Sequence, residues 1–259
     1  MNNQYAIGIT TFEKRFDDFF KPLVLSIRSQ NSNVPILVAI NGESEKDFCE
    51  SYRKNILKFC SEQNFIYPIF HTEFRSLSKL WNNLVITNKY DYTLILNDDI
   101  EIGPVFFNEL ESFHFNRCSE DKSYVINEDE RSPFNFSHFM IYREDLIKCG
   151  WFDERFLSIG WEDVDFQIKY TQVFNKQINK FVCNSIKNHR PKNHRLQNIQ
   201  KSNDDDNYAR INQEFFNNKY KIHYDKGLLM YEKFIDDCDQ YPYEQFFREN
   251  RCAMRQIEP

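Results

Sequence analysis

The sequence predicts an α/β fold in which a Rossmann-like, mostly parallel sheet is flanked by helices and followed by a helical C-terminal extension. Apolar runs at residues 5–9, 35–40, 65–70 and 92–96 have the length of buried strands. A stretch with helical periodicity follows each of the first three runs. Strands separated by helices at this spacing form a parallel sheet with right-handed crossovers.

The three intervening helices are expected over residues 16–30, 48–63 and 76–88. In the first of them the apolar side chains fall mostly on one side of the helix; these are Phe19, Phe20, Leu23, Leu25 and Ile27. Ligands of such sheets bind beyond the carboxyl ends of the strands. The polar loops of this half of the chain all follow strands, so we expect the functional site at that edge.

Beyond residue 101 the regular alternation ends. The expected elements there are a helix at 106–113, strands at 124–126 and 136–142, a helical turn at 143–149, a helix at 161–173 and a strand at 181–186. From residue 207 the chain is expected to be mostly helical, and the apolar residues between Leu228 and Ile235 suggest an amphipathic helix.

Composition narrows the function classes. Hydrophobic residues make up 41% of the 259, which is enough for a sizeable core, and the net charge of −6 without a basic tract argues against nucleic-acid binding. The seven cysteines are scattered without a CxxC pair, a pattern that suits a reducing compartment. Without a signal peptide or an apolar stretch of roughly 20 residues, we expect a cytoplasmic protein, with contact at the inner face of a membrane left open.

The first chemical motif is Asn97-Asp98-Asp99, which ends an apolar strand. Adjacent carboxylates at a sheet edge need water or a cation to compensate their charge. A hard divalent cation with oxygen ligands is one such compensation, and it keeps positions open for substrate phosphates. A plain strand-terminating turn is the alternative, because Asn and Asp are good turn formers.

The second motif is an acidic helix start between two Gly-Trp pairs, Gly150-Trp151 and Gly160-Trp161. The helix dipole alone favours Glu162 and Asp163 at this position. A carboxylate fixed there beside an aromatic wall is also suited to take a proton from a sugar hydroxyl. Asp165 does not share a helix face with Asp163, so we expect it to orient neighbouring groups.

A histidine after the last expected strand completes the set. His189 follows the strand at 181–186, and its position raises the case for a metal ligand over an ordinary surface histidine. His194 lies close enough along the chain to be a rival for the same role.

The order of these motifs resembles the family 2 glycosyltransferases with the GT-A fold, and the stretch from Gly160 to Asp165 also resembles the acceptor-side motif of the β-1,4-galactosyltransferases. The resemblance covers roughly residues 5–190. Its parts are Ile7-Gly8-Ile9-Thr10-Thr11-Phe12 with Arg15, then Asn41-Gly42, Asn97-Asp98-Asp99, Phe152-Asp153-Glu154-Arg155-Phe156, Trp161-Glu162-Asp163-Val164-Asp165 and His189.

The resemblance implies a role for each matching residue. Asp163 would be the catalytic base with Glu162 beside it on the acceptor side, and Trp161 and Trp151 would line the acceptor site. Asp99 and His189 would bind Mn²⁺ or Mg²⁺. The donor nucleotide would be held by Thr10, Thr11, Phe12, Arg15, Asn41, Asn82, Asn97 and Asp98. Arg75 and Lys79 could reach phosphate oxygens, although a solvated helix face explains them as well.

Two residues depart from the family pattern. Ile40 stands where an Asp usually reads the base, with Asn41 next to it, and Asn97 replaces the first acid of the DXD motif. A UDP-sugar is favoured as donor, although these departures leave the base open.

The resemblance also implies an activity and a domain organisation. The reaction would be inverting transfer from a nucleotide-sugar to a hydroxyl of a glycan or lipid-linked acceptor. Separately, the Asn-, Lys- and Phe-rich composition suggests an AT-rich bacterial source, and from it we expect a role in bacterial surface polysaccharide assembly. The expected division is a GT-A domain at 1–206, with a nucleotide-binding half at 1–101 and an acceptor-binding half at 102–206, and an extension at 207–259.

Two rival functions remain at this point. A sugar nucleotidyltransferase has a similar sheet but carries a Gly-rich basic loop after its first strand, and residues 10–15 contain no glycine. A non-catalytic glycan-binding or scaffold protein could keep the fold and use the tryptophans for sugar stacking. The aromatic residues of the tail leave a homodimer open.

Overall fold

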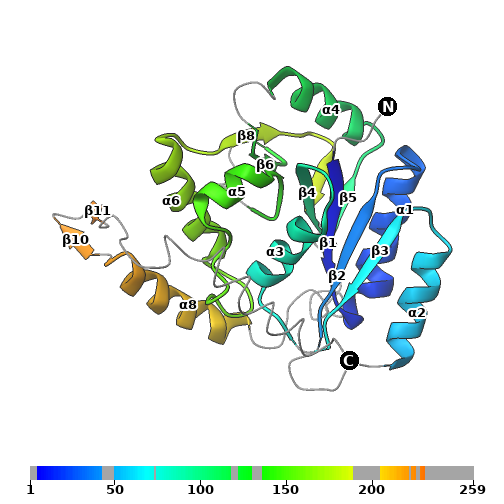
Figure 1. The fold of residues 1–259 in the computed structure, drawn as a ribbon, viewed down its shortest axis with the longest axis horizontal. Helices are drawn as coiled ribbons and strands as arrows, with labels where there is room; N and C mark the ends of the chain where they lie inside the picture. The colour runs from blue at the N-terminus through cyan, green and yellow to red at the C-terminus, as the bar shows by residue number, and fades with distance from the viewer. Residues whose placement is uncertain are drawn as a thin grey trace.

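The computed structural model describes residues 5–42, 50–72, 74–117, 122–129, 136–188, 205–221, 223–225 and 228–230. Its centre is a seven-stranded sheet with the order β3-β2-β1-β4-β7-β6-β8 (Figure 1). The strands are β1 (Tyr5–Thr11), β2 (Ile36–Ile40), β3 (Ile66–Phe70), β4 (Tyr92–Asn97), β6 (Tyr124–Asn127), β7 (His138–Tyr142) and β8 (Asn179–Val182).

The first four strands are parallel to one another, and the pattern becomes mixed where the second half begins. β7 runs antiparallel to both β4 and β6, and β8 runs parallel to β6. The predicted α/β class, with a mostly parallel sheet flanked by helices, is therefore confirmed. The parallel part places the ends of β1, β2 and β4 at one edge.

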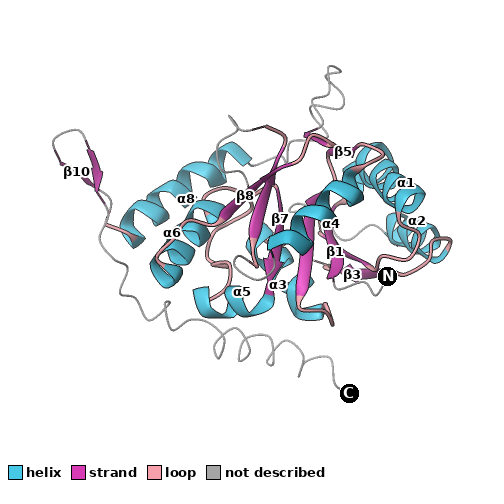
Figure 2. Cartoon of the chain, turned by 90° about the horizontal axis from the view of Figure 1, so that it is seen from above, coloured by secondary structure: helices cyan, strands magenta, loops and turns pink. Residues whose placement is uncertain are grey.

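Helices cover both faces of the sheet, as Figures 1 and 2 show from two sides. α1 (Lys21–Gln30), α2 (Glu50–Ser61) and α4 (Phe106–Arg117) pack into one hydrophobic core. α3 (Leu77–Thr87), α5 (Arg143–Cys149) and α6 (Glu162–Phe174) belong to the other. A 3₁₀ turn η1 (Glu13–Arg15) and a π-helical turn η2 (Phe16–Phe20) connect β1 to α1.

Alternation along β1 divides its side chains between the two cores. Ile7 and Ile9 belong to the core under α1 and α2, whereas Gly8 faces α3. A Cβ at Gly8 would lie 2.8 Å from Cδ1 of Ile95 and 3.1 Å from Cδ1 of Leu84. The absence of a side chain at residue 8 therefore lets α3 approach the sheet closely.

A small second sheet lies beyond the end of β4. β5 (Ile100–Ile102) pairs antiparallel with β9 (Ile186–Asn188), and Ile100 is opposite Asn188. The pairing brings the end of β9 beside the residue that follows Asp99. The single strand predicted at 181–186 is thus wrong in detail, because the chain forms β8, turns and then forms β9.

The C-terminal part contains one helix and one hairpin among the described residues. α8 (Asp205–Lys219) lies beside α6, and β10 (His223–Asp225) pairs antiparallel with β11 (Leu228–Met230) (Figures 1 and 2). The predicted helix at Leu228 is wrong at its start, where the chain is a strand, and residues 231–259 lie outside the described part. The division at residue 206 stays a prediction. None of the described helices combines the length and apolar character needed to span a bilayer.

Candidate active site

A pocket lies at the edge of the sheet where β1, β2 and β4 end. Five segments line it: the end of β1 with η1, the residue after β2, the N-terminal part of α3 with the loop before it, the end of β4, and the loop before α6. The lining residues are Thr10, Thr11, Phe12, Arg15, Asn41, Phe74, Arg75, Leu77, Leu80, Asn97, Asp98, Ser158 and Ile159. Seven of the eight predicted donor-binding residues therefore meet in one pocket; Asn82 does not line it.

Arg15 forms the electrostatic centre of this pocket. Its Nη2 lies 2.6 Å from Oδ1 of Asp98 and 2.9 Å from Oδ2 of Asp99. The guanidinium also lies over the rings of Phe12 and Phe19, at 5.5 and 5.3 Å from their centroids. The side chains of Arg15 and Asp98 are 13% and 3% exposed, so solvent screens this pair little. Arg15 thus offsets part of the negative charge of the two adjacent carboxylates.

Asp98 is the more deeply buried of these two carboxylates. Burial raises the pKa of Asp98 to about 7, although the nearby charge of Arg15 opposes this shift. Its Oδ2 atom has no hydrogen-bond partner within the described part of the chain. A buried carboxylate oxygen without a partner is costly, so this atom is suited to accept a cation or a ligand hydroxyl.

The residues near Asp99 bear on the predicted metal site. β9 ends at Asn188, opposite Ile100. His189 and His194, the two candidate histidine ligands, lie outside the described residues. Within the described part of the chain, no group of three or more His, Cys, Asp and Glu side chains is placed to hold a metal ion. The chemistry of the donor set, with two carboxylates and one unpartnered oxygen, fits a hard divalent cation.

Two of the predicted donor contacts have other partners in the structure. The side-chain amide of Asn41 pairs with the backbone of Arg75, donating to its carbonyl at 2.9 Å and accepting from its N–H at 2.8 Å. Asn82 is fully buried and bonds the backbone of Phe152 and the carboxylate of Glu154. The donor contact of Asn82 stays a prediction, and in this structure its amide holds the loop after α5.

The loop between α5 and α6 carries strained backbone. Trp151, Ser158 and Trp161 have φ of 68°, 49° and 74°, in the left-handed region, and Gly160 has a φ of 107°. Non-glycine residues in this region cost of order 1–3 kcal/mol each and cluster at functional sites. The surrounding structure therefore has to hold this loop in place.

Glu162 and Asp163 begin α6, as predicted. Glu162 is 4% exposed, and its Oε2 has no hydrogen-bond partner within the described residues. Burial raises the pKa of Glu162 to about 8, and the charge of Asp163 adds to the shift. Asp163 is half-buried, and its Oδ1 accepts the N–H of Val164 at 2.8 Å. Burial raises the pKa of Asp163 as well, which makes it a stronger base than an exposed Asp.

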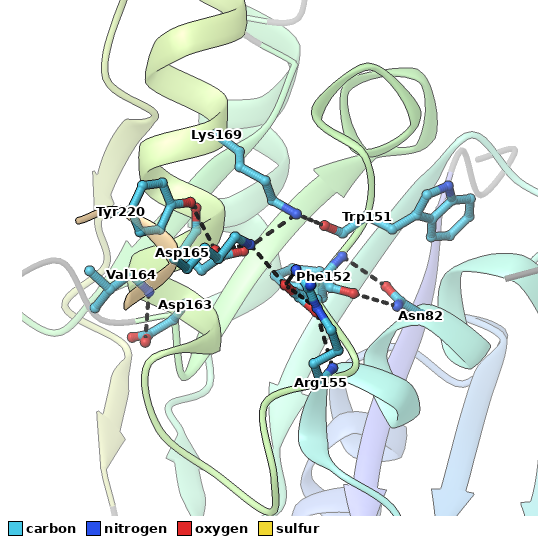
Figure 3. A network of polar contacts seen from close by, with 11 residues as sticks. Asn82, Trp151, Phe152, Arg155, Asp163, Val164, Asp165, Lys169 and Tyr220 are labelled. Carbon is cyan, nitrogen blue, oxygen red and sulfur yellow. Dashed lines mark hydrogen bonds and ion pairs between the residues drawn. The ribbon is translucent and has the colours of Figure 1, made fainter. Parts of the chain in front are cut away.

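Behind these two acids lies a network of buried charges (Figure 3). Asp165 is fully buried and accepts from Lys219 Nζ at 2.5 Å and from the Tyr220 hydroxyl at 2.8 Å. Lys219 also reaches Asp153 Oδ2 at 2.8 Å, and Arg155 pairs with the same carboxylate. The expectation that Asp165 orients neighbouring groups agrees with this placement.

The two tryptophans differ in their surroundings. Trp151 is 2% exposed and packs in the second core, and its place in the acceptor site stays a prediction. Trp161 is partly exposed, and its ring packs against Phe216 of α8 at 4.9 Å between ring centroids and 37° between ring planes. Trp161 thus stays a candidate for the acceptor side.

Sequence reasoning missed three residues near this site. Asn212 and Lys219 of α8 contact the loop and the helix that carry the acids, and nothing in their polar segment marked them out. His138 begins β7 opposite Leu96 and is 1% exposed. Burial lowers the pKa of His138 to about 4, against the opposing charge of Asp99, so its ring is neutral at pH 7. The signal that could have found His138 is a histidine at the start of a strand that pairs with β4.

Comparison with known proteins identifies the fold. No protein-family model and no curated protein matches the sequence. Among solved structures, S. aureus TarS matches with a TM-score of 0.55 and 11% identity, over 82% of this chain and 43% of that chain. Mannosyltransferase PcManGT from Pyrobaculum calidifontis, in complex with GDP-Man and Mn²⁺, matches at 0.54 and 12%, over 75% and 59%. The fold is the GT-A glycosyltransferase fold.

A further structure extends the GT-A comparison. TarS 1–349 in complex with UDP-GlcNAc matches with a TM-score of 0.55 and 10% identity, over 82% of this chain and 71% of that chain. The chain spans less than half the length of the S. aureus TarS chain, 43% of it. At such identities the likeness establishes the GT-A fold, and the finer resemblance to family 2 or to the galactosyltransferases stays a prediction.

Proposed function

We propose that this protein is an inverting glycosyltransferase that moves a sugar from a nucleotide-diphosphate-sugar to a hydroxyl of a glycan or lipid-linked acceptor. One observation carries the proposal. The pocket that holds Arg15, Asp98 and Asn97 at the sheet edge is closed on another side by Ser158 and Ile159, from the loop that leads into Glu162 and Asp163. The loop that precedes the proposed base therefore borders the pocket that holds Arg15, which supports a site shared by the two groups.

The donor nucleotide would bind in this pocket. Thr10, Thr11 and Phe12 line the side on which a base would lie, and Arg15 and Arg75 supply positive charge for phosphate oxygens. Neighbours of this fold are in complex with UDP-GlcNAc and with GDP-Man. A UDP-sugar is the first candidate donor and a GDP-sugar the second. Both are kept because Ile40 is apolar and the amide of Asn41 is already bonded to the backbone of Arg75, so neither side chain selects the base.

Mn²⁺ or Mg²⁺ is the proposed cofactor. Asp99 and Asp98 would hold it together with His189, the residue after Asn188, where β9 ends opposite Ile100. When bound, the cation supplies positive charge for the departing diphosphate. A Mn²⁺-bound neighbour of the same fold supports the assignment. Arg15, which now pairs with both carboxylates, would turn towards the phosphates.

Asp163 would act as the base on the acceptor hydroxyl. It is half-buried with a raised pKa, and it lies at the start of α6 next to Glu162. Oε2 of Glu162, which has no hydrogen-bond partner among the described residues, would accept a second acceptor hydroxyl. Attack from the face opposite the diphosphate inverts the anomeric centre. Trp161 offers an aromatic surface next to these acids, and sugar faces stack on such rings.

A nucleotide screen tests the proposal. We expect UDP or GDP, and UDP-GlcNAc or GDP-mannose, to raise the melting temperature in the presence of Mn²⁺, because a ligand of the native state stabilises it with occupancy. Slow hydrolysis of one of these donors should accompany binding. Binding of a donor without hydrolysis or transfer would favour a non-catalytic glycan-binding protein, and failure of every nucleotide to bind would overturn the proposal. The place in bacterial surface polysaccharide assembly rests on composition alone.

A further inference from the structure

One side chain of α8 fixes the loop that leads into α6. Asn212 is 1% exposed, and its Nδ2 donates to the carbonyls of Leu157 and Gly160 at 2.7 and 2.9 Å and approaches that of Ile159 at 3.3 Å. Its Oδ1 accepts the N–H of Leu157 at 2.8 Å. A loop without secondary structure thus owes three short backbone hydrogen bonds to a residue more than 50 positions away in sequence.

The bonds from Asn212 fall on the strained part of the chain. Ser158 and Trp161 hold left-handed conformations that non-glycine residues adopt at a cost, and Gly160 lies between them. Such conformations persist only where the surroundings over-determine them. Asn212 supplies that constraint one residue before Trp161, and Trp161 in turn stacks on Phe216 of the same helix.

A second side chain of α8 holds the first turn of α6. Lys219 lies between Asp165 and Asp153, at 2.5 and 2.8 Å, and its side chain is 2% exposed. Tyr220 donates to Asp165 as well. Asp165 is two residues after Asp163, so the Lys219 bridge fixes the turn of helix on which the proposed base is carried.

We propose that α8 is a positioning element for glycosyl transfer, in which Asn212 and Lys219 set the start of α6, with Glu162 and Asp163, against the donor pocket. The expected effect on turnover rests on the proposed function. The claim that α8 holds the loop and the start of α6 depends only on the hydrogen bonds and ion pairs described above. Neither residue lines the pocket, so both act through the loop and helix that they hold.

Hydrogen exchange tests the structural part. In Asn212→Ala we expect the backbone amides of residues 157–164 to exchange about tenfold faster or more, because local opening no longer breaks the Asn212 bonds. Amides of β1 and β4 should keep their wild-type rates. Asn218→Ala is the matched control, since Asn218 is an exposed residue of the same type on the same helix. Unchanged exchange at 157–164 in Asn212→Ala would overturn the proposal.

Kinetics test the functional part, with UDP-GlcNAc or GDP-mannose as donor. In Asn212→Ala and in Lys219→Met we expect kcat to fall up to about 100-fold, because a shift of about 1 Å at a reacting group has that effect. The donor KM should stay within about threefold, since most of the pocket lies on other segments. A rise in KM at unchanged kcat, or equal behaviour of Asn218→Ala, would contradict positioning.

Two further measurements distinguish failure of the positioning proposal from failure of the proposed function. Asn212→Asp keeps an acceptor for the Leu157 N–H but loses the amide donors, so it should repeat the kcat loss if Asn212→Ala does not fold. If the wild-type protein hydrolyses neither donor, the proposed function fails at the donor step. The hydrogen-exchange comparison still decides whether α8 positions the loop.

Discussion

Single carboxylates at the start of α6 lie in surroundings that change their acidity. Glu162 has a pKa raised to about 8 by burial, so the native state binds its proton more tightly than the unfolded chain does. The stability that this proton contributes is present below the unfolded pKa and is lost as pH rises towards the folded pKa. One oxygen of the same side chain has no hydrogen-bond partner in the described part of the chain.

A pH titration of stability follows from Glu162. Between about pH 5 and pH 8 we expect the Glu162 contribution to the free energy of unfolding to fall by up to about 1.4 kcal/mol per pH unit. In Glu162→Gln this contribution is absent, so urea denaturation at the two pH values should show a smaller loss of stability than in the wild type. Equal losses in the two proteins would show that Glu162 does not titrate in this range.

Substitution of Asp163 separates chemistry from donor binding. Asp163→Asn keeps the shape of the side chain and its acceptor for the Val164 N–H but removes the proton-accepting charge. We expect transfer to fall by about 100- to 10,000-fold, the range of a lost general base, while the nucleotide affinity measured by calorimetry stays near wild type. Near-normal turnover in this variant would remove Asp163 from the role of base.

At the scale of elements, the contact between β1 and α3 is set by a single missing side chain. In Gly8→Ala the new Cβ would lie 2.8 Å from Cδ1 of Ile95 and 3.1 Å from Cδ1 of Leu84, so these two buried side chains must move. We expect a loss of about 1–3 kcal/mol in unfolding free energy, as for other overpacked cores. Gly103→Ala is a control, since its Cβ would come no closer than 3.4 Å to Ser185. Equal effects of both changes would contradict this account of the β1–α3 contact.

Elements with strong periodicity were predictable from sequence, and those made by distant pairing were not. The strands ending at Thr11 and Asn97 and the helices between them follow from local apolar patterns. β5 and β9 are three residues long and exist through pairing with each other. The strand at Leu228 looked helical because a short apolar run fits both periods.

The site residues divide in the same way, into those that a local motif marks and those whose role only the folded chain shows. Arg15, Asp98 and Asp163 carry motifs in order along the chain, and the structure brings Arg15 and Asp98 into one pocket. The amide of Asn82 looked like a donor contact, yet it bonds the loop at Phe152, because a buried amide takes the backbone partners that the fold offers. Asn212 sits in a polar helix, and only the folded chain shows what it holds.

At the scale of the whole molecule, internal charge balance predicts the effect of metal removal. Asp98 and Asp99 already pair with Arg15, so we expect the fold to form without a cation at this site. We expect EDTA to change the melting temperature of the nucleotide-free protein by no more than about 1–2 °C, which is less than the about 2–4 °C that a stability change of about 1 kcal/mol produces in a protein of this size. EDTA should remove the Mn²⁺-dependent stabilisation by UDP or GDP. A large fall in melting temperature without nucleotide would point to a structural metal instead.

The sheet order has a consequence for how the protein is made. β1 lies between β2 and β4, and Tyr5 pairs with Tyr92. At about 5–20 residues per second, the roughly 90 residues between them take about 5–20 seconds to leave the ribosome. During that interval one edge of an apolar strand has no partner. The nascent chain is therefore most exposed to aggregation before β4 emerges, so a chaperone that shields β1 would raise the yield of folded protein more than one that acts after release.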